Sequence, residues 1–371
     1  MMKSFPIRIF LVVHILLISL SAIGQTTYYQ QFRGNSNKFE YLIYLNNVHD
    51  KLSGNLYFNL LNSEQTANFT RIEFVGNIEN DSLITLRKFT EENNFASGVN
   101  LNNQLNIIVH LSDSMNDTIF LPMQFSPGEI RFESITTAKT VKLVPRDDSP
   151  EATFEMTVLV PGSGSSLLLR DLVLKFLNIY PDSVGNELVS PEVQLSIEQN
   201  LFLNDYLGLQ SLYDSSGASF NWYRTASTQI LYNSPELFCM ENTLYAFTGG
   251  AHGMENISYG IFSPLTDRQL QFNDIFKPDT QHIISNLITN SVKEMQSISQ
   301  DSSLPDYLYF VKMIEPNENI YLTPNGLGFY YNSYEIAPYS TGQTNVFFRF
   351  ADLTGLLNKE FESMIVRTKK D

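Results

Sequence analysis

The segment YAFTGGAHGME, residues 245–255, holds the side chains best placed to do chemistry. It sets His252 among three glycines, directly after an apolar run typical of a strand. A histidine in such a loop can serve as a general acid or base, but it needs a nucleophile or a second acid beside it. Sequence proximity offers Glu255 and Asp267 for that part. Catalysis by His252 with one of these carboxylates is therefore one hypothesis for the loop.

The second hypothesis is a tight turn, and the residue types favour it. Gly249 and Gly250 can adopt positive φ at little cost, so the strand can reverse where a side chain would clash. One ring nitrogen of His252 can donate to a nearby carbonyl while the other accepts, which would pin the turn. We therefore predict no catalytic residue, and a structural or binding loop formed by Thr248, Gly249, Gly250, His252 and Gly253.

Motifs for a metal or a cofactor are absent from the sequence. The histidines show no HxH, HxxH or HExxH spacing, and no GxSxG, Walker or GxGxxG motif occurs. Zinc sites, nucleophile elbows and nucleotide-binding loops depend on those spacings. We expect no metal and no cofactor. Cys239 is the single cysteine, and we expect it to be a buried, unreactive thiol.

Residues 1–24 have the layout of a cleaved secretory signal peptide. Lys3 and Arg8 give a positive start, Ile9 to Leu20 form an apolar run, and small residues precede Gln25. The run is shorter than the about 20 apolar residues that a membrane-spanning helix needs. We expect export to the periplasm, the cell surface or the medium, with no stable membrane span after cleavage.

The chain is strongly acidic, with a formal net charge of -15. Loss of Lys3 and Arg8 with the signal peptide would change this value to -17. Such a surface repels nucleic acid and anionic lipid and attracts basic partners, although salt screens the attraction beyond ~8 to 10 Å. We expect no nucleic-acid partner, and the oligomeric state is left open. Simple solubility is the alternative reason for the acidity.

The N-terminal part, residues 25–147, is expected to be an all-β domain. Between residues 39 and 143, apolar runs recur about every 8 to 12 residues, separated by Asn, Ser, Asp and Gly. This spacing, without a helical period, predicts an antiparallel meander that packs as a sandwich or closes as a barrel. Such a barrel can enclose a small ligand, but small barrels are commonly filled by their own side chains.

The stretch VPRDDSPEA, residues 144–152, is predicted to be a linker because it combines prolines and acidic residues without apolar periodicity. Beyond it, helix and strand signals mix. Ser190 and Pro191 mark the start of a helix, and apolar strand runs follow. Helices segregated from runs of strands indicate a C-terminal α+β domain with a mainly antiparallel sheet, so the chain as a whole is expected to be α+β.

Two segments of the C-terminal part resemble a known family. Residues 245–276 and 327–357 are similar to the RsiV-type domain of unknown function, which forms the C-terminal part of the extracellular region of the anti-sigma-V factor. By layout alone, residues 152–244 resemble the PdaC-type domain that precedes it, so the RsiV-type domain would span residues 245–360. The motif positions, besides Thr248 to Gly253, are Tyr245, Asp274, Phe276, Tyr334, Glu335, Pro338, Tyr339 and Gly342.

The resemblance implies protein binding without catalysis. In the anti-sigma factor this region is a lysozyme receptor. Peptidoglycan deacetylases that carry the two domains do their chemistry in a separate catalytic domain, which we do not expect here. Only eight residues precede the apolar run, so transmembrane signalling is not part of the expectation.

We therefore expect an exported bacterial binding protein of the cell envelope without enzymatic activity. Its target would be a basic protein, such as a cell-wall hydrolase of the lysozyme kind, or an envelope glycan such as peptidoglycan. Two alternatives stay open. One is a cell-wall or glycan hydrolase that uses His252 with an acidic partner, and the other is a carrier of a small ligand inside the N-terminal β domain.

Overall fold

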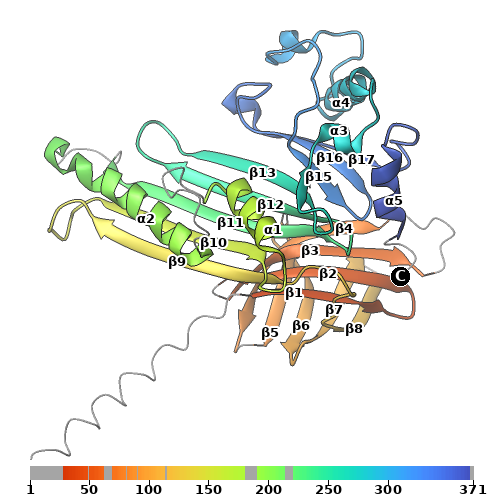
Figure 1. Cartoon of the computed structure of the whole chain (residues 1–371), viewed down its shortest axis with the longest axis horizontal. Helices are drawn as coiled ribbons and strands as arrows, with labels where there is room; N and C mark the ends of the chain where they lie inside the picture. Colours follow the sequence, from red (N-terminus) through yellow and green to blue (C-terminus); the bar gives the residue numbers. More distant parts are fainter. Residues whose placement is uncertain are drawn as a thin grey trace, which may run out of the picture.

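The residues that the structure describes fold around three sheets, of eight, six and three strands. Figure 1 shows the eight-stranded sheet in orange tones, the six-stranded sheet in yellow to teal, and the three-stranded sheet in blue. The expected signal peptide at residues 1–24 and His49 lie outside the described residues. Within the described ranges, no helix is long and apolar enough to cross a membrane. This computed structural model describes residues 28–48, 50–61, 69–80, 82–89, 91–112, 115–179, 190–213 and 220–367.

The N-terminal sheet is an antiparallel meander that curls into a nearly closed barrel. Each strand pairs with the next one in the chain. Just beyond the last strand, Met123 forms a bridge with Phe32, and the Gln124 N–H donates to the Gln31 carbonyl, so the two edges meet. The predicted barrel-like architecture is confirmed. The strands are β1 (Tyr28–Asn35), β2 (Phe39–Val48), β3 (Lys51–Leu60), β4 (Thr70–Glu79), β5 (Leu83–Lys88), β6 (Asn94–Leu101), β7 (Gln104–Ser112) and β8 (Met115–Pro122).

The barrel interior is packed with its own side chains. One apolar cluster takes members from all eight strands, among them Phe32, Tyr41 and Phe74. Strand β2 is buried on both faces, because Tyr41 points into this cluster while Leu42 and Tyr44 join the core of the six-stranded sheet. The barrel is therefore a filled structural unit that packs against the second sheet.

One barrel strand was not apparent from the sequence. The runs expected between residues 39 and 139 correspond to β2–β8, whereas the run expected at 140–144 belongs mainly to the next sheet. The remaining barrel strand is β1, whose sequence YYQQFRGN carries no clear alternation. The reason is that Gln31 is fully buried and donates to Glu129 at 2.9 Å, so a polar residue occupies a core position.

The second sheet is covered on one face by two helices, α1 (Leu167–Phe176) and α2 (Pro191–Leu207). All its neighbouring strands are antiparallel except β10 and β11, which are parallel because α1 and α2 lie between them in the chain. Ser166 and Ser190 cap the two helices, and Pro191 stands in the first turn as predicted. In spatial order the strands are β14 (Arg268–Leu270), β13 (Met254–Ser263), β12 (Phe238–Phe247), β11 (Trp222–Asn233), β10 (Glu151–Pro161) and β9 (Phe132–Lys142).

The segment predicted to be a linker, residues 144–152, instead contains the connection of a β hairpin. It joins β9 to β10, which pair antiparallel inside the six-stranded sheet. Prolines and aspartates suit a short turn as well as a linker, and here the Ser149 hydroxyl accepts from the Val144 N–H. The chain passes from one sheet to the other earlier, between β8 and β9. The division expected at residues 244 and 245 likewise falls inside β12.

The third sheet is small and antiparallel, and its helices surround it. Its strands are β15 (Ile320–Thr323), β16 (Gly326–Tyr331) and β17 (Thr344–Arg349), and the helices are α3 (Phe272–Ile275), α4 (Gln281–Met295) and α5 (Lys359–Arg367). Short 3-10 helices occur at η2 (Gly208–Leu212), η4 (Leu304–Tyr307) and η5 (Tyr339–Thr341). One apolar cluster joins this sheet and its helices to β11–β14, so the predicted C-terminal α+β architecture is confirmed.

Candidate functional site

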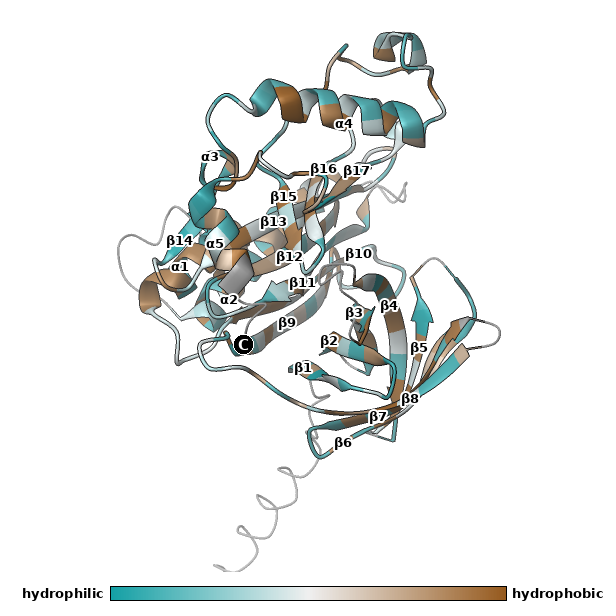
Figure 2. Ribbon diagram, turned by 90° about the vertical axis from the view of Figure 1, so that its right-hand side faces the viewer, coloured by the Kyte–Doolittle hydropathy of each residue, from teal (hydrophilic) through white to brown (hydrophobic). Residues whose placement is uncertain are grey.

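A groove of ≈ 680 Å³ lies where the barrel meets the helix-free face of the six-stranded sheet. Figure 2 shows the relative placement of the two sheets. Sites for small ligands are commonly concave and found at such junctions. The barrel lines the groove with residues of β2–β5, including Lys51, Ser53, Asn77 and Arg87. The sheet lines it with Glu155, Thr157, Thr225, Ala226, Ser227, Thr243, Tyr245 and Glu255.

The polar lining follows from the alternation of side chains along each strand. On β10, Phe154 and Met156 face the helices and belong to the apolar core, so Glu155 and Thr157 point to the other side. The register then places polar side chains in cross-strand rows. One row runs Glu155, Thr225, Tyr245, Glu255, and the next contains Thr157, Ser227 and Thr243. The floor of the groove is therefore rich in hydroxyl groups, with one aromatic ring.

The inner end of the groove adjoins a buried carboxyl group. Glu241 is two residues from Thr243 on β12, and it accepts from the Tyr259 hydroxyl at 2.9 Å and from Thr243 at 3.2 Å. Burial raises the pKa of Glu241, and the charge of Glu73 on β4 raises it further. A carboxyl group perturbed in this way beside a cleft is typical of functional sites, although buried structural networks also produce it.

A second buried polar group lies on the groove-facing side of the barrel. Asn46 is opposite Ser53 in the register and shares the face of Tyr44. Both polar atoms of its side chain are buried, and within the described residues neither has a hydrogen-bond partner. Leaving such atoms unpaired costs about 1–3 kcal/mol each. Asn46 therefore lowers the stability of the junction between the two sheets.

The TGGAHG loop is a tight turn at the end of β12, next to the groove. Gly249 and Gly250 have φ of 100° and 96°, which the turn interpretation requires. His252 is exposed rather than buried, its Nδ1 lies 2.9 Å from the Gly253 carbonyl, and its ring stacks on Tyr339 at 4.1 Å. A side chain at Gly253 would overlap the ring of Tyr245, one of the groove residues.

The predicted motif at residues 334–342 lies against the same hairpin. Asn332 accepts from the Ile257 N–H at 2.8 Å and donates to the Ile257 carbonyl at 2.9 Å, which pairs the free edge of β13. Gln343 donates to Glu255 at 3.0 Å. Together with the ring stack on Tyr339, these contacts tie residues 332–343 to β13 and to the turn. Tyr334 and Gly342 take positive φ within this segment, at 72° and 77°.

The structure gathers some of the predicted site residues and separates others. Thr248 to Gly253 and Tyr245 lie beside the groove, while Tyr334, Glu335, Pro338, Tyr339 and Gly342 form the neighbouring segment. Asp274 and Phe276 belong elsewhere. The Asp274 carboxylate accepts from the Gln271 N–H at the start of α3 and pairs with Arg268, and Phe276 is fully buried against Phe272. Their roles are structural.

The carboxylates proposed as partners of His252 have other contacts. Glu255 accepts from Gln343, and Asp267 accepts from the Ser166 hydroxyl at 2.5 Å. Among the residues described, no group of three or more His, Cys, Asp or Glu side chains is arranged to hold a metal. Cys239 is buried, and burial raises the pKa of its thiol to about 12. It therefore stays protonated and unreactive near neutral pH.

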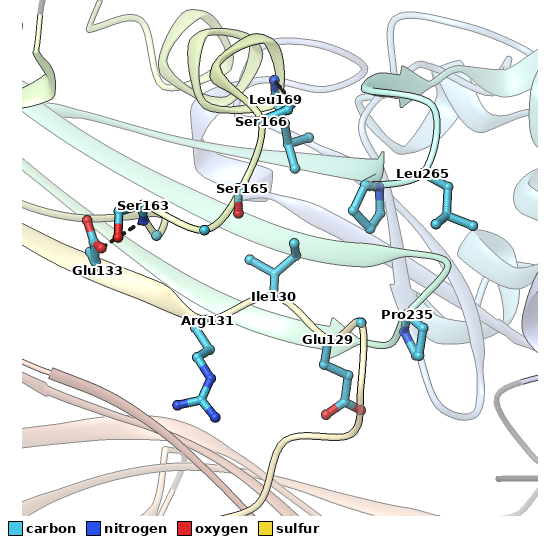
Figure 3. Close-up of a pocket in the computed structure, with 14 residues that line it drawn as sticks. Glu129, Ile130, Arg131, Glu133, Ser163, Ser165, Ser166, Leu169, Pro235 and Leu265 are labelled. Carbon is cyan, nitrogen blue, oxygen red and sulfur yellow. Dashed lines mark hydrogen bonds between the residues drawn. The ribbon is translucent and has the colours of Figure 1, made fainter.

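A second pocket, of ≈ 460 Å³, lies at the PGSGSS segment and the start of α1. Two of its backbone donors are bound by protein side chains. Glu133 accepts from the Ser163 N–H at 2.8 Å, and the Ser166 hydroxyl accepts from the Leu169 N–H at 3.0 Å. Figure 3 shows the side chains of Glu129 and Arg131 directed toward the barrel, away from this segment. The larger groove is therefore the better candidate site.

Comparison with known proteins supplies a family for part of the chain. Residues 273–351 match the model of a family described as "Protein of unknown function (DUF3298)". The match is limited to this part of the chain. This part contains α4, the three-stranded sheet and the segment 332–343, whereas the TGGAHG turn and both walls of the groove lie before it.

The solved structures that are similar to this chain include two from the DUF3298 family. A member of the DUF3298 family from Bacteroides fragilis is 23% identical, covers 66% of this chain and 98% of its own, and has a TM-score of 0.58. A DUF3298 family protein from Pseudomonas aeruginosa is 17% identical, covers 62% of this chain and 96% of its own, and has a TM-score of 0.46. At this identity the first likeness shows a shared fold. No curated protein matches the chain.

Sequence reasoning missed most of the groove. On β10 its polar side chains sit at alternate positions, as in TFEMTV, and this alternation marks one polar face of the strand. This alternation is visible in the sequence. The sequence does not show the cross-strand register or the packing of β3–β5 against the same face, and these turn a polar sheet surface into a groove.

Proposed function

We propose that this chain is an exported, non-enzymatic binding protein of the bacterial cell envelope that holds a glycan in the groove. The observation that supports this most is the lining of the groove. Hydroxyl, amide and charged groups surround one exposed aromatic ring, Tyr245, and Val48, Leu52, Val75 and Ala226 add apolar surface. Sugars offer hydroxyl groups to the polar part of such a lining and apolar C–H faces to its aromatic and apolar part.

The finer family assignments belong to the same proposal. We assign residues 245–360 to the RsiV-type domain and residues 152–244 to the PdaC-type domain. The RsiV-type assignment is supported by the motif segments at residues 245–276 and 327–357, and the later segment overlaps the DUF3298 match. Export rests on the signal-like layout of residues 1–24.

A basic protein is the second candidate target. The net charge of -15 favours encounter with a basic cell-wall hydrolase of the lysozyme kind, through steering that salt weakens. Net charge alone defines no contact surface for a basic protein, whereas the groove has a defined lining, so the glycan is the preferred target. The small-ligand carrier is disfavoured because apolar side chains fill the barrel interior. A hydrolase built on His252 is disfavoured because both proposed carboxylates are engaged elsewhere.

Titration calorimetry with chitotriose, a soluble oligosaccharide, tests the proposal on the chain from Gln25 onward. We expect Tyr245→Ala to weaken binding by roughly three- to tenfold, because a ring contact contributes about 0.5–1.5 kcal/mol. Tyr307→Ala is the matched control, since Tyr307 is exposed to a similar degree and lies away from the groove. Chitotriose should be recovered uncleaved. Absence of glycan binding, together with binding of lysozyme, would replace this proposal by the second candidate.

A further inference from the structure

The two walls of the groove carry opposite charges. Lys51 and Arg87 come from the barrel, and Glu155 and Glu255 come from the six-stranded sheet. All four side chains belong to exposed residues. Where their contacts are defined, the partner is neutral: Lys51 donates to Asn77, Arg87 to the Glu91 carbonyl, and Glu255 accepts from Gln343.

These charges do not hold the two sheets together. Across the described residues, no ion pair joins any of the four to another charged group. The ion pair between the barrel and the start of the second sheet is made elsewhere, by Arg33 and Glu129 at 2.9 Å. Charges that face one another across a groove without pairing are free to bind charges on a ligand.

The spacing of the charges sets the size of ligand they can reach. Glu155 and Glu255 stand in one cross-strand row, three strand spacings apart, which is about 14 Å. Lys51 and Arg87 are on strands two spacings apart, so at least about 10 Å separates their backbones. A single sugar or amino acid is too small to contact both ends. An oligomer with charges at several positions can contact both walls.

We infer that the groove selects a zwitterionic ligand, namely a glycan fragment that bears a peptide with free amino and carboxyl groups. This inference rests on the proposed glycan-binding function and narrows its substrate class. The amines face Glu155 and Glu255, and the carboxylates face Lys51 and Arg87. The guanidinium of Arg87 suits a carboxylate especially well, because it can donate two parallel hydrogen bonds. The hydroxyl-rich floor between the charges binds the sugar.

Three probes separate this inference from glycan binding in general. Chitotriose is neutral, a glucosamine trimer carries amines only, and a soluble disaccharide with a diaminopimelate-containing peptide carries both charges. We expect the peptide-bearing probe to bind at least tenfold more tightly than chitotriose at 50 mM NaCl, and to lose most of that advantage at 500 mM NaCl. Equal affinities for these two probes, or tightest binding of the amine-only trimer, would overturn the inference.

Charge-removing variants assign the effect to the groove. Lys51→Met, Arg87→Met, Glu155→Gln and Glu255→Gln should each weaken binding of the peptide-bearing probe by about two- to fivefold, as expected for exposed ion pairs, and should weaken chitotriose binding by less. Lys88→Met and Glu192→Gln are the matched controls, because both residues lie outside the groove. Unchanged affinities in all four groove variants would refute the inference. If none of the three probes binds the wild-type chain, the proposed glycan-binding function itself is refuted.

Discussion

At the scale of single residues, Glu241 shows how the packing of the two sheets sets the chemistry beside the groove. It is a carboxyl group in a largely apolar place, held by Tyr259 and Thr243. Burial and the nearby Glu73 raise its pKa. The folded chain therefore binds this proton more tightly than the unfolded chain, where the pKa of glutamate is about 4.3. The stability that Glu241 contributes is fully present below that value, and it is lost as pH rises through the raised pKa of the folded state.

We expect Glu241→Gln to increase the free energy of unfolding at pH values above the raised pKa of Glu241. Glutamine removes the buried charge, and its amide oxygen still accepts from the Tyr259 hydroxyl. Urea unfolding at pH 5 and pH 8 measures the effect, which should be larger at pH 8. Glu79→Gln, at an exposed position of β4, is the control and should follow the wild type. The same pH dependence in the wild type and in Glu241→Gln would contradict the assignment.

At the scale of elements, the hairpin of β12 and β13 and the segment 332–343 form one unit beside the groove. The turn has the backbone that its glycines predict, with positive φ at Gly249 and Gly250. His252 makes a hydrogen bond of the kind that the sequence suggested, with Nδ1 2.9 Å from the Gly253 carbonyl oxygen. Its ring is outside and stacks on Tyr339, which comes from a segment 87 positions later in the chain. Local sequence predicted the turn, whereas the contact depends on tertiary packing.

In the other elements too, local sequence predicted the secondary structure but not the tertiary contacts. Periodicity and capping residues predicted strands β2–β8 and the start of α2, because those signals are local. Strand β1 was missed because Gln31 takes a core position, which its hydrogen bonds to Tyr29, Glu129 and Asn233 make acceptable. Asp274 and Phe276 were identified as positions of the family motif, and they support α3 and the core. A motif read along the chain does not distinguish residues that touch a ligand from residues that hold the fold.

We expect Asn332→Ala to loosen the segment 332–343. The change removes both of its hydrogen bonds to the backbone of Ile257. The Ile257 carbonyl still accepts from Asn319 at 2.9 Å, so only the partly buried N–H loses its partner, which should cost about 1 kcal/mol. Urea unfolding measures the loss, and hydrogen exchange at the Ile257 amide should become faster. Gln343→Ala, in the same segment, removes only an exposed bond to Glu255 and should cost less than about 0.5 kcal/mol. Equal effects of the two changes would show that Asn332 does not hold the edge of β13.

At the scale of the whole molecule, the path of the chain decides which parts can separate. The chain leaves the barrel after β8 and enters the second sheet at β9, so the hairpin at residues 143–150 lies within one sheet. The strands β9 and β10 that flank it are 11 residues each and pair along their whole length. Side chains from the barrel and from the second sheet also share one apolar cluster. The groove is formed by both, so its geometry depends on their staying together.

A protease site inserted between Asp147 and Asp148 tests this arrangement. Both side chains are exposed, so the insertion should be tolerated and cleaved. We expect the two fragments to co-elute in gel filtration after cleavage and to separate only in denaturant, because the β9–β10 ladder and the shared core still join them. Glycan affinity should survive the cut within about twofold. The same insertion after Arg367 is the control for the added sequence. Fragments that separate under native conditions would instead support the linker that the sequence suggested, with the barrel as an independent domain.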